Sequence, residues 1–487
     1  MELKNFSKLM LDIIKEIQPL IQDYLKDNKI FDTYYDYPEV TYEKDFPRFS
    51  TKFYTNCPCK YSSLILNKEP ESINIYTLKS IKAFVVEMKK EPCFINKFLT
   101  EPIKNTFGKA WGDLLLFEII LADVIDRTLL IYKFSLPTED EFLQISKPIY
   151  NYIFADSYTY DIYVPILFTK FNFDNKSFQN YSITRMNKDI QLARCNALKY
   201  VPGVNYALEA CATHAFVIHD IHKNNPNHSF FEQTVEDEYQ LPLKEIKSFF
   251  SSLIVQDNCV SGYSQIIILP HEYATEYTAT LPYIRSFRVE EYPNYFKDYY
   301  WNSQSLPCIE EKFSESILEL TERISKLDSK NGFERKLDIS ISRLRSSYLK
   351  ISEEDSFLDL VIGIETLLSD DDKGELTYKL SIRVAVLLNE FSDYKPLNRY
   401  EIYSAMKKIY AYRSAIVHGK AEKDIEKSKN IMLGNTNYET KMLAEFFLQN
   451  LIKTAFEHQD IFTTTGKIEE LLLIDSGSQI NKREVIK

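Results

Sequence analysis

Apolar residues recur every three or four positions along the last third of the chain, from about 306 to 462. In the first of these rows, Phe313, Ile317 and Leu320 would lie on one face of a helix, because an α-helix completes a turn in 3.6 residues. Five further segments have the same spacing. We therefore predict an all-α helical bundle over residues 306–462. Its helices are expected at 313–324, 337–348, 352–368, 376–388, 399–417 and 438–457.

Local signals mark where several of these helices begin and end. Ser352 precedes Asp355 by three residues, and a hydroxyl at such a position accepts a hydrogen bond from an N–H group of the first helical turn. Gly419 follows the last apolar position of the fifth helix, and glycine readily adopts the left-handed conformation that ends helices. Residues 463–487 are predicted to form a loosely attached tail.

The first 300 residues show a mixed α/β pattern, so the chain as a whole is predicted to be α+β. Residues 1–155 are expected to be mostly helical. Residues 156–300 add short β-branched and aromatic runs bounded by Pro, Asn and Asp, which are typical of strands. The periodicity is lost between about 289 and 306, which places the last domain boundary there. Helices are expected at about 9–25, 77–89, 113–132 and 139–153, and strands at 160–171, 215–219 and 265–269.

Composition excludes several classes of protein. Hydrophobic residues make up 45% of the 487 residues and aromatic residues 14%, whereas chains that do not fold are poor in both. The 11 glycines are too few for propellers, barrels or glycine-rich nucleotide loops. The formal charge of −11 argues against a protein that coats nucleic acid, because phosphate binding relies on clustered Lys and Arg. Any contact with nucleic acid is therefore expected to be local.

Hydropathy and cysteine usage favour a cytoplasmic protein without a membrane segment. The most apolar stretch, 114–131, is interrupted by four charged residues, so it predicts a buried helix. The N-terminal segment is amphipathic and lacks the apolar core of a secretory signal. The seven cysteines do not form a disulfide framework, and Cys57-Pro58-Cys59 has no second ligand pair at zinc-finger spacing.

Three charged residues occupy apolar rows of the predicted helices, namely Glu365, Arg383 and Arg413. A buried charge must be paired, whereas a charge at the edge of a row can reach water along its apolar stem. Each residue alone fits the edge interpretation. Because three such residues occur together, we expect Glu365 to pair with Arg383 or Arg413 across the bundle, in a bidentate contact that fixes the guanidinium.

The end of the fifth expected helix carries the most specific motif of the chain. It reads YAYRSAIVHG over residues 410–419, so that four residues separate Arg413 from His418. This spacing resembles the R-x4–6-H motif of the HEPN superfamily. Such a short motif occurs by chance in many chains, so the sequence around it decides how much it implies.

The surrounding sequence extends the resemblance over most of the predicted bundle. The segment from Asp359 to Leu368, which includes Glu365, is similar to the family's helix with a glutamate before two leucines, and residues 380–388, which include Arg383, are similar to its next helix. Residues 343–355 resemble the start of the Apea-like branch of HEPN proteins. That branch is associated with abortive-infection defence against phage.

The resemblance implies cleavage of RNA without a metal or cofactor, by Arg413 and His418. The imidazole of His418 would accept the proton of a ribose 2′-hydroxyl, and the cation of Arg413 would stabilise the phosphate in its transition state. The implied products are a 2′,3′-cyclic phosphate and a 5′-hydroxyl. Side chains five residues apart leave a helix about 140° apart, so we expect the turn at Gly419 or a homodimer of the HEPN-like domain to complete the site.

Basic and aromatic residues flank the motif. Lys407, Lys408 and Lys420 together with Tyr410 suit a contact with single-stranded RNA. The alternative is a solvated helix face for the lysines and a core position for Tyr410. By analogy with the family, the RNA would be tRNA or another structured RNA, and a phage-derived signal sensed by the N-terminal region would activate the enzyme.

Two other interpretations remain open. A HEPN domain that has lost catalysis can serve as an RNA-binding or dimerisation scaffold, although the presence of both Arg413 and His418 favours the enzyme. His219 and His222 suggest a metal pair, but no acidic third ligand stands out at helical spacing. The short motifs of P-loop NTPases, zincins and serine hydrolases do not occur in the chain.

Overall fold

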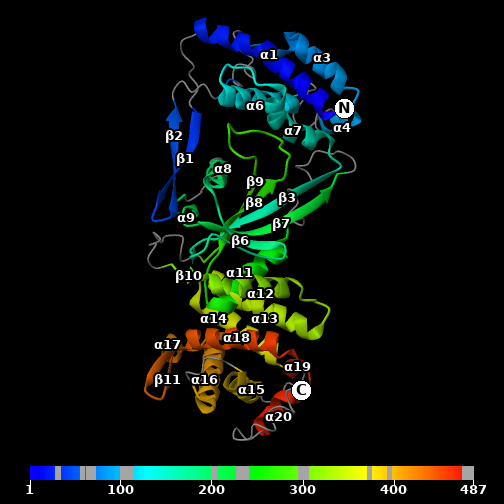
Figure 1. Cartoon of the computed structure of the whole chain (residues 1–487). Coiled ribbons are helices and arrows are strands. Elements are labelled where there is room, and N and C mark those ends of the chain that lie inside the picture. Colours follow the sequence, from blue (N-terminus) through cyan, green and yellow to red (C-terminus); the bar gives the residue numbers. More distant parts are fainter. Residues whose placement is uncertain are drawn as a thin grey trace. The chain divides into compact units, whose positions relative to one another are not determined.

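The chain folds into two compact units, each assembled from separate stretches of sequence (Figure 1). The computed structural model describes residues 1–27, 35–54, 61, 73–98, 115–198, 206–225, 241–293, 306–369, 376–391, 397–464 and 466–473. The first unit comprises Met1–Pro165, Gln179–Pro242 and Ser264–Glu290, and the second comprises Ile166–Phe178, Leu243–Tyr263 and Glu291–Lys487. The sequence pattern predicts consecutive domains instead, because periodicity does not reveal which distant segments pack together.

A cluster of helices opens the first unit and packs through aromatic side chains. The ring of Phe84 stacks on Phe117 with 4.9 Å between centroids and meets Phe6 edge-on at 5.8 Å. Helix α7 begins at a capping box, in which the side chains and backbone N–H groups of Thr138 and Glu141 bond reciprocally. The helices are α1 (Leu3–Asp27), α3 (Lys79–Met88), α4 (Pro92–Phe98), α6 (Leu115–Tyr132) and α7 (Glu139–Phe154), with the short 3-10 helix η1 (Ile75–Thr77) before α3.

An antiparallel sheet follows these helices in the first unit, as the β-branched runs predict. Its strands are neighbours in the order β6-β7-β3-β8-β9, and β3 and β7 form its long central pair (Figure 1). Apolar side chains of β3, β7 and β8 are buried. The bounds are β3 (Ser157–Pro165), β6 (Tyr181–Arg185), β7 (His214–Asn224), β8 (Tyr263–Pro270) and β9 (Arg285–Glu291).

The region expected to be mostly helical also contains a hairpin that the sequence analysis misses. Strand β1 (Tyr35–Glu43) pairs antiparallel with β2 (Phe46–Tyr54). Lys44 and Asp45 make the two-residue turn with φ of 49° and 71°. Such a turn normally carries Asn-Gly or Asp-Gly, so the Lys-Asp pair gave no signal. Short helices α8 (Lys188–Leu198) and α9 (Tyr206–Glu209) complete the described part of this unit.

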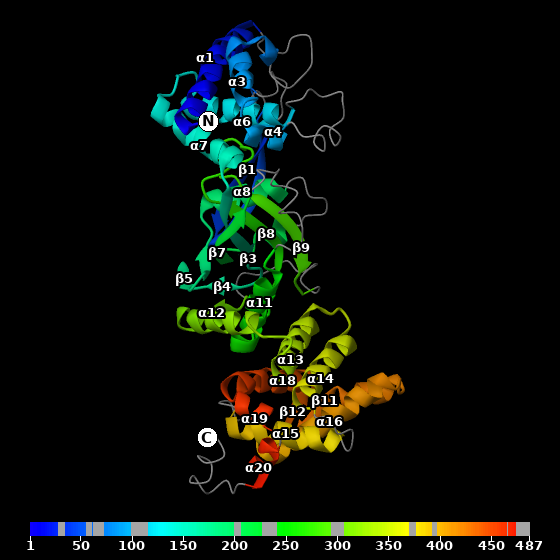
Figure 2. The same ribbon diagram turned by 90° about the vertical axis from the view of Figure 1, so that its right-hand side faces the viewer.

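The second unit is a helical bundle in which α18 packs against α13, α14, α15 and α16 (Figure 2). The predicted helices are present, and α16 begins and ends at the predicted residues. Among the described residues, no helix combines the length and apolarity needed to cross a membrane. The helices are α11 (Leu243–Asp257), α12 (Glu311–Ser325), α13 (Gly332–Leu349), α14 (Glu353–Leu368), α15 (Leu376–Phe391), α16 (Arg399–Val417), α17 (Glu422–Ser428), α18 (Thr440–Glu457), α19 (Gln459–Thr463) and α20 (Lys467–Leu473).

Two expectations for this region were wrong. The range 306–462 is not entirely helical, because β10 (Cys308–Ile309) pairs with β4 (Lys170–Phe171), and β11 (Asn430–Leu433) and β12 (Thr436–Glu439) form a hairpin before α18. Nor do residues 463–473 belong to a loose tail. Helix α20 contacts α15, and Leu471 is buried in the bundle core. Strand β5 (Asn175–Phe178) also belongs to this unit.

Some sequence expectations fall outside the described residues. Most of the predicted boundary, 294–305, is among them, and so are Cys57 and Cys59.

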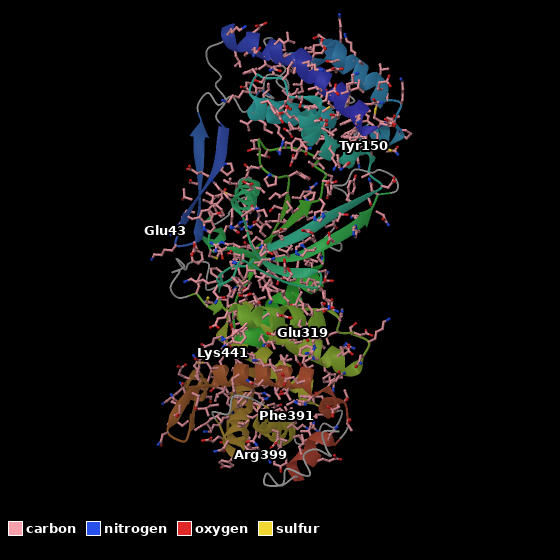
Figure 3. The ribbon with its side chains drawn as sticks, in the orientation of Figure 1. Glu43, Tyr150, Glu319, Phe391, Arg399 and Lys441 are labelled. Atoms are coloured by element: carbon pink, nitrogen blue, oxygen red, sulfur yellow. The ribbon has the colours of Figure 1, made fainter. Side chains whose placement is uncertain are left out.

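The expected N-cap at Ser352 is confirmed, since its hydroxyl accepts the N–H of Asp355 at 3.2 Å. Figure 3 labels Arg399 at the start of α16, the helix that carries the predicted motif.

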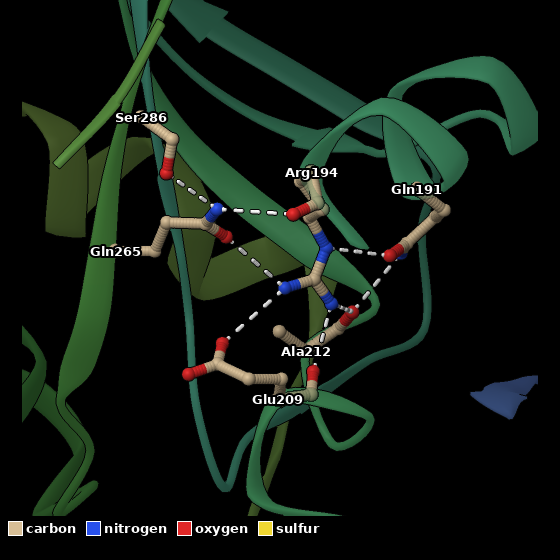
Figure 4. A network of polar contacts seen from close by, with 6 residues as sticks. All are labelled: Gln191, Arg194, Glu209, Ala212, Gln265 and Ser286. Carbon is tan, nitrogen blue, oxygen red and sulfur yellow. Dashed lines mark hydrogen bonds and ion pairs between the residues drawn. The ribbon is translucent and has the colours of Figure 1, made fainter. Parts of the chain in front are cut away.

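A buried arginine holds together the segment between β6 and β7 (Figure 4). Arg194 is 0% exposed, and its guanidinium donates to the side chain of Gln191 at 2.7 Å and to the carbonyl of Glu209 at 2.7 Å. It also lies 3.4 Å from the Glu209 carboxylate and from the Gln265 side chain, which in turn donates to Ser286. Burial lowers the pKa of Arg194 and raises that of Glu209, because the attraction between the two charges offsets only part of their loss of hydration.

Candidate functional site

The predicted R-x4–6-H motif lies at the C-terminal end of α16. This helix begins at a capping box, in which the Asn398 side chain accepts the N–H of Glu401 at 3.0 Å and the Glu401 carboxylate accepts the N–H of Asn398 at 2.9 Å. Its buried row includes Ile402 and Ile409. Arg413 follows Ile409 by four residues, so it continues the row at the margin of the core.

The helix ends in a Schellman motif, as the position of Gly419 predicts. Gly419 has a φ of 58°, and its N–H donates to the carbonyl of Ile416 at 3.1 Å. The N–H of Lys420 donates to the carbonyl of Ala415 at 3.0 Å, which completes the pair of bonds that defines this helix end. His418 is the C-cap residue, and its side chain is exposed.

Arg413 and His418 do not form a pair within one chain. His418 has φ −93° and ψ 8°, which lie in the bridge region between helical and extended backbone, at the point where the helix ends. No hydrogen bond joins the two side chains among the contacts of the described residues, in agreement with their separation of about 140° around the helix.

Arg413 instead faces Glu365 on α14, which confirms one of the two predicted pairings. The Nε atom of Arg413 lies 3.7 Å from Oε1 of Glu365, and the side chains are 28% and 18% exposed. Both atoms are buried and neither has a hydrogen-bond partner in the described part of the chain, so the expected bidentate contact is not made. The carboxylate therefore holds the guanidinium by charge while leaving its donors unsaturated.

Tyr410 completes this cluster one helical turn before Arg413. The guanidinium carbon of Arg413 lies 5.6 Å from the centre of the Tyr410 ring, within the range of a cation–π contact. The pKa of the Tyr410 hydroxyl is raised, mainly by burial and further by the carboxylate of Glu365, while Arg413 acts in the opposite direction. Tyr410 is half-buried rather than a full core residue.

Arg383 and Asp359 serve other parts of the bundle. The Nη1 atom of Arg383 donates to the carbonyl of Leu368 at 2.6 Å, so Arg383 satisfies a carbonyl at the C-terminal end of α14. Asp359 is buried and accepts from Arg343 on α13 at 2.7 Å. These contacts of Arg383 and Asp359 join neighbouring helices.

The predicted RNA-binding lysines are exposed, and two of them have partners. The Lys407 ammonium lies 5.5 Å from the centre of the Tyr403 ring, and Lys408 donates to the carbonyl of Met432 in the β11–β12 hairpin at 3.0 Å. Lys420 follows the end of α16 directly and is exposed beside His418 in sequence. Thus Lys420 is the lysine closest along the chain to the helix end that carries the motif.

The two histidines that suggested a metal pair, His219 and His222, have different partners in the structure. His222 lies 2.9 Å from the hydroxyl of Thr159, whereas Nδ1 of His219 lies 3.2 Å from the carboxylate of Asp161. The acidic partner that the sequence analysis did not find is therefore on another strand. The sequence did contain a sign of this partner. Asp161 is a charged residue inside the apolar run at 160–168, and a buried strand seldom carries a carboxylate that has no partner.

Comparison of the chain with protein-family models, with curated proteins and with solved structures finds no match.

Proposed function

We propose that the chain is a metal-independent endoribonuclease of the HEPN type that acts in defence against phage, with Arg413 and His418 as its catalytic residues. The observation that carries this proposal is the contact between Arg413 and Glu365 at 3.7 Å, next to a helix end that exposes His418. A guanidinium that is held by charge but retains free donors suits a phosphate ligand.

The proposed reaction is an internal transfer of the phosphoryl group. His418 takes the proton of the ribose 2′-hydroxyl, and the 2′-oxygen attacks the adjacent phosphorus. The bond from phosphorus to the 5′-oxygen breaks, and that oxygen receives a proton, which leaves a 2′,3′-cyclic phosphate and a 5′-hydroxyl. Arg413 stabilises the negative charge that develops on the phosphate oxygens.

The geometry of one chain favours a homodimer as the active form. Arg413 and His418 leave α16 in different directions, so a second copy related by a two-fold axis would bring His418 of the partner subunit beside Arg413. Helices α15 and α16 also expose the large apolar side chains of Tyr378, Tyr400 and Val417. Exposed apolar side chains of this size support an interface between copies.

The remaining parts of the proposal rest on the sequence resemblance. The enzyme would act in the cytoplasm, with tRNA or another structured RNA as its substrate, and would bind RNA with Lys407, Lys408 and Lys420. A phage-derived signal at the N-terminal region would activate it. Asp359 and Arg383 would support the site indirectly, through the helix contacts described above.

The first prediction concerns the catalytic pair. We expect purified protein to cleave total tRNA in EDTA and to leave cyclic phosphate ends, and we expect Arg413→Ala and His418→Ala each to slow cleavage by at least about a hundredfold. Arg399→Ala is the matched arginine control, because Arg399 lies on the same helix with a similar exposure of 31% and pairs with Glu390. His458→Ala is the histidine control, since His458 is the C-cap of α18.

Both controls should cleave at the wild-type rate, and all four variants should keep the wild-type circular dichroism spectrum. Cleavage that requires a divalent cation, or that survives in the Arg413 and His418 variants, would contradict the proposal. If the wild type cleaves neither purified tRNA nor RNA in an extract of phage-infected cells, the non-catalytic scaffold is favoured instead. In that case, RNA binding and dimerisation of the wild type should be measured directly.

A further inference from the structure

The central strand pair of the first unit is interrupted by a β-bulge that brings polar side chains together. Tyr160 pairs with Ile221, but Ile162 pairs with Ile218, so β7 has one residue more than β3 across this interval. Asp161 on β3 faces the extra residue. Asp220 lies in the bulge with a φ of 54°, a conformation that Asp and Asn adopt more readily than most residues.

Asp161 is the centre of this polar cluster. Its Oδ1 atom accepts the backbone N–H of Asp220 at 2.9 Å and lies 3.0 Å from Nε2 of His271, which directly follows β8. Its Oδ2 atom lies 3.2 Å from Nδ1 of His219 on β7. Three adjacent strands therefore supply the groups around one carboxylate, which is only 9% exposed.

The imidazole of His219 is oriented from both sides. Its Nδ1 faces Asp161, and its Nε2 lies 2.8 Å from the hydroxyl of Ser182, which lies 2.8 Å from the hydroxyl of Thr184 on the same strand. The order serine, histidine and aspartate matches that of hydrolytic triads. Ser182, however, is 1% exposed, so its hydroxyl is inaccessible to a substrate carbonyl, and its contact serves to orient His219.

The carboxylate of Asp220 adds a second anionic group. Its Oδ1 lies 3.8 Å from Nδ1 of His271, the ring nitrogen that does not face Asp161. When each residue contributes a single ligand atom, those of Asp161, Asp220 and His271 all lie within 4.8 Å of one another. Two ligand atoms bound to one zinc ion at about 2.1 Å are separated by at most about 4.2 Å, so small rotations of the exposed Asp220 side chain would bring all three into range. Asp220 is 72% exposed and His271 37%, which leaves a path for an ion from solvent.

We propose that Asp161, Asp220 and His271 form a binding site for a divalent transition-metal ion such as Zn²⁺. Two carboxylates and one imidazole match the charge and the borderline softness of this ion. His219 acts on the site by holding the second oxygen of Asp161, the kind of contact that orients metal ligands. Three protein ligands leave further coordination positions for water.

The site belongs to the first unit, whereas the proposed ribonuclease residues belong to the second. The proposed phosphoryl transfer itself requires no metal. The ligands of the metal site come from β3, from β7 and from the residue that follows β8, so the ion would clamp these strands and stabilise the first unit. An ion that binds the folded chain but not the unfolded chain increases the free energy of unfolding with the logarithm of the ion concentration, and so raises the melting temperature.

The test is a titration of the chelator-treated full chain with ZnCl₂ by isothermal titration calorimetry at neutral pH. It uses a background with Cys57→Ser and Cys59→Ser, so that zinc held by these thiols does not contribute. We expect one Zn²⁺ per chain, and we expect Asp220→Asn and His271→Gln each to weaken binding at least tenfold. Asn tolerates the positive φ at position 220, so that variant keeps the backbone of the bulge.

His222→Gln is the matched control, because His222 is an exposed histidine of the same strand that contacts Thr159 instead of the cluster. It should bind zinc as the parent does. Zn²⁺ should raise the melting temperature of the parent and of His222→Gln but not of the other two variants. Absence of zinc binding by the parent, equal binding by all variants, or equal affinity for Mg²⁺ and Zn²⁺ would overturn the proposal. The result is independent of whether the chain cleaves RNA.

Discussion

At the scale of the residue, two arginines of this chain differ in how far their guanidinium groups are buried and in how completely they are hydrogen-bonded. Arg194 is fully buried and hydrogen-bonded to side chains and carbonyls around it, as expected of a residue that fixes a fold. Arg413 is partly exposed, faces Glu365 at 3.7 Å and is not saturated with hydrogen bonds. The unsaturated arginine is the one that we propose to bind a phosphate group.

The network around Arg194 leads to a prediction about stability. Arg194→Met should lower the free energy of unfolding by about 3 to 5 kcal/mol, because it leaves the carboxylate of Glu209 buried without its counter-charge. The melting temperature and the urea midpoint would measure the loss. The double variant Arg194→Met with Glu209→Gln should regain part of it, since the amide carries no charge. Equal losses in the single and double variants would contradict this explanation.

A surface arginine provides the control for that experiment. Arg185 is 37% exposed and lies 3.5 Å from Asp45. Exposed ion pairs contribute about 1 kcal/mol or less, so Arg185→Met should change the melting temperature little. A comparable loss in both variants would show that the two arginines differ less than their burial indicates.

The sequence predicts which residues are unusual better than it predicts their partners. Glu365, Arg383 and Arg413 were recognised because charges on apolar rows are rare, and all three do make contacts between helices or with a helix end. Arg383 nevertheless bonds to a backbone carbonyl, because a periodic pattern says nothing about which group lies across the interface. For the same reason Asp161 and His271, far apart in sequence, gave no sign that they meet.

At the scale of the element, helices with long amphipathic rows were the most predictable feature. Helix α16 matches its predicted bounds because its cap, its apolar row and Gly419 all lie in one continuous stretch. The hairpins were not predicted. Strands β11 and β12 have four residues each, too short to show alternation, and their turn at Gly434 lies between the fifth and sixth predicted helices.

The capping box of α16 leads to the prediction at this scale. Asn398→Ala should cost about 1 kcal/mol of helix stability, because the N–H of Glu401 loses its acceptor. Hydrogen exchange at the first turn of α16, measured by mass spectrometry, should become faster. Asn398→Asp should keep slow exchange, since a carboxylate also accepts this bond and carries a favourable charge at a helix N-terminus. Equal exchange in the two variants would count against the cap.

At the scale of the whole molecule, the two units show what a single sequence leaves hidden. Residues 166–178 and 243–263 belong to the second unit although they interrupt the sequence of the first. The helix α11 within the second of these stretches was not predicted, and membership of a unit depends on contacts over long separations. The predicted mixture of a helical start, a sheet and a C-terminal helical region is present. The HEPN-like function of that region stays a prediction.

One buried charge in the first unit affects the stability of the chain as a function of pH. Lys97 is 0% exposed, and its Nζ donates to the hydroxyl of Tyr158 at 2.8 Å and lies 4.4 Å from the centre of the Tyr152 ring. Burial lowers the pKa of Lys97 from 10.5 to about 7. The Tyr158 hydroxyl keeps two other partners, since it donates to the carbonyl of Tyr152 and accepts from Asn225.

These contacts predict that Lys97→Met stabilises the chain and that the gain depends on pH. The unfolded chain binds more protons than the folded chain between the folded pKa of about 7 and the ordinary value of 10.5, so wild-type stability rises with pH across this window. Below about pH 7 the wild type bears the full cost of burying the ammonium. The methionine variant avoids that cost, and Tyr158 keeps its other hydrogen bonds.

The difference in melting temperature between variant and wild type should therefore be largest near pH 6.5 and shrink steadily toward pH 9.5. Lys90→Met is the control, because the Lys90 side chain is 61% exposed, and it should show no such trend. A variant that is less stable than the wild type at every pH would mean that the contacts of Lys97 with the tyrosines outweigh its desolvation.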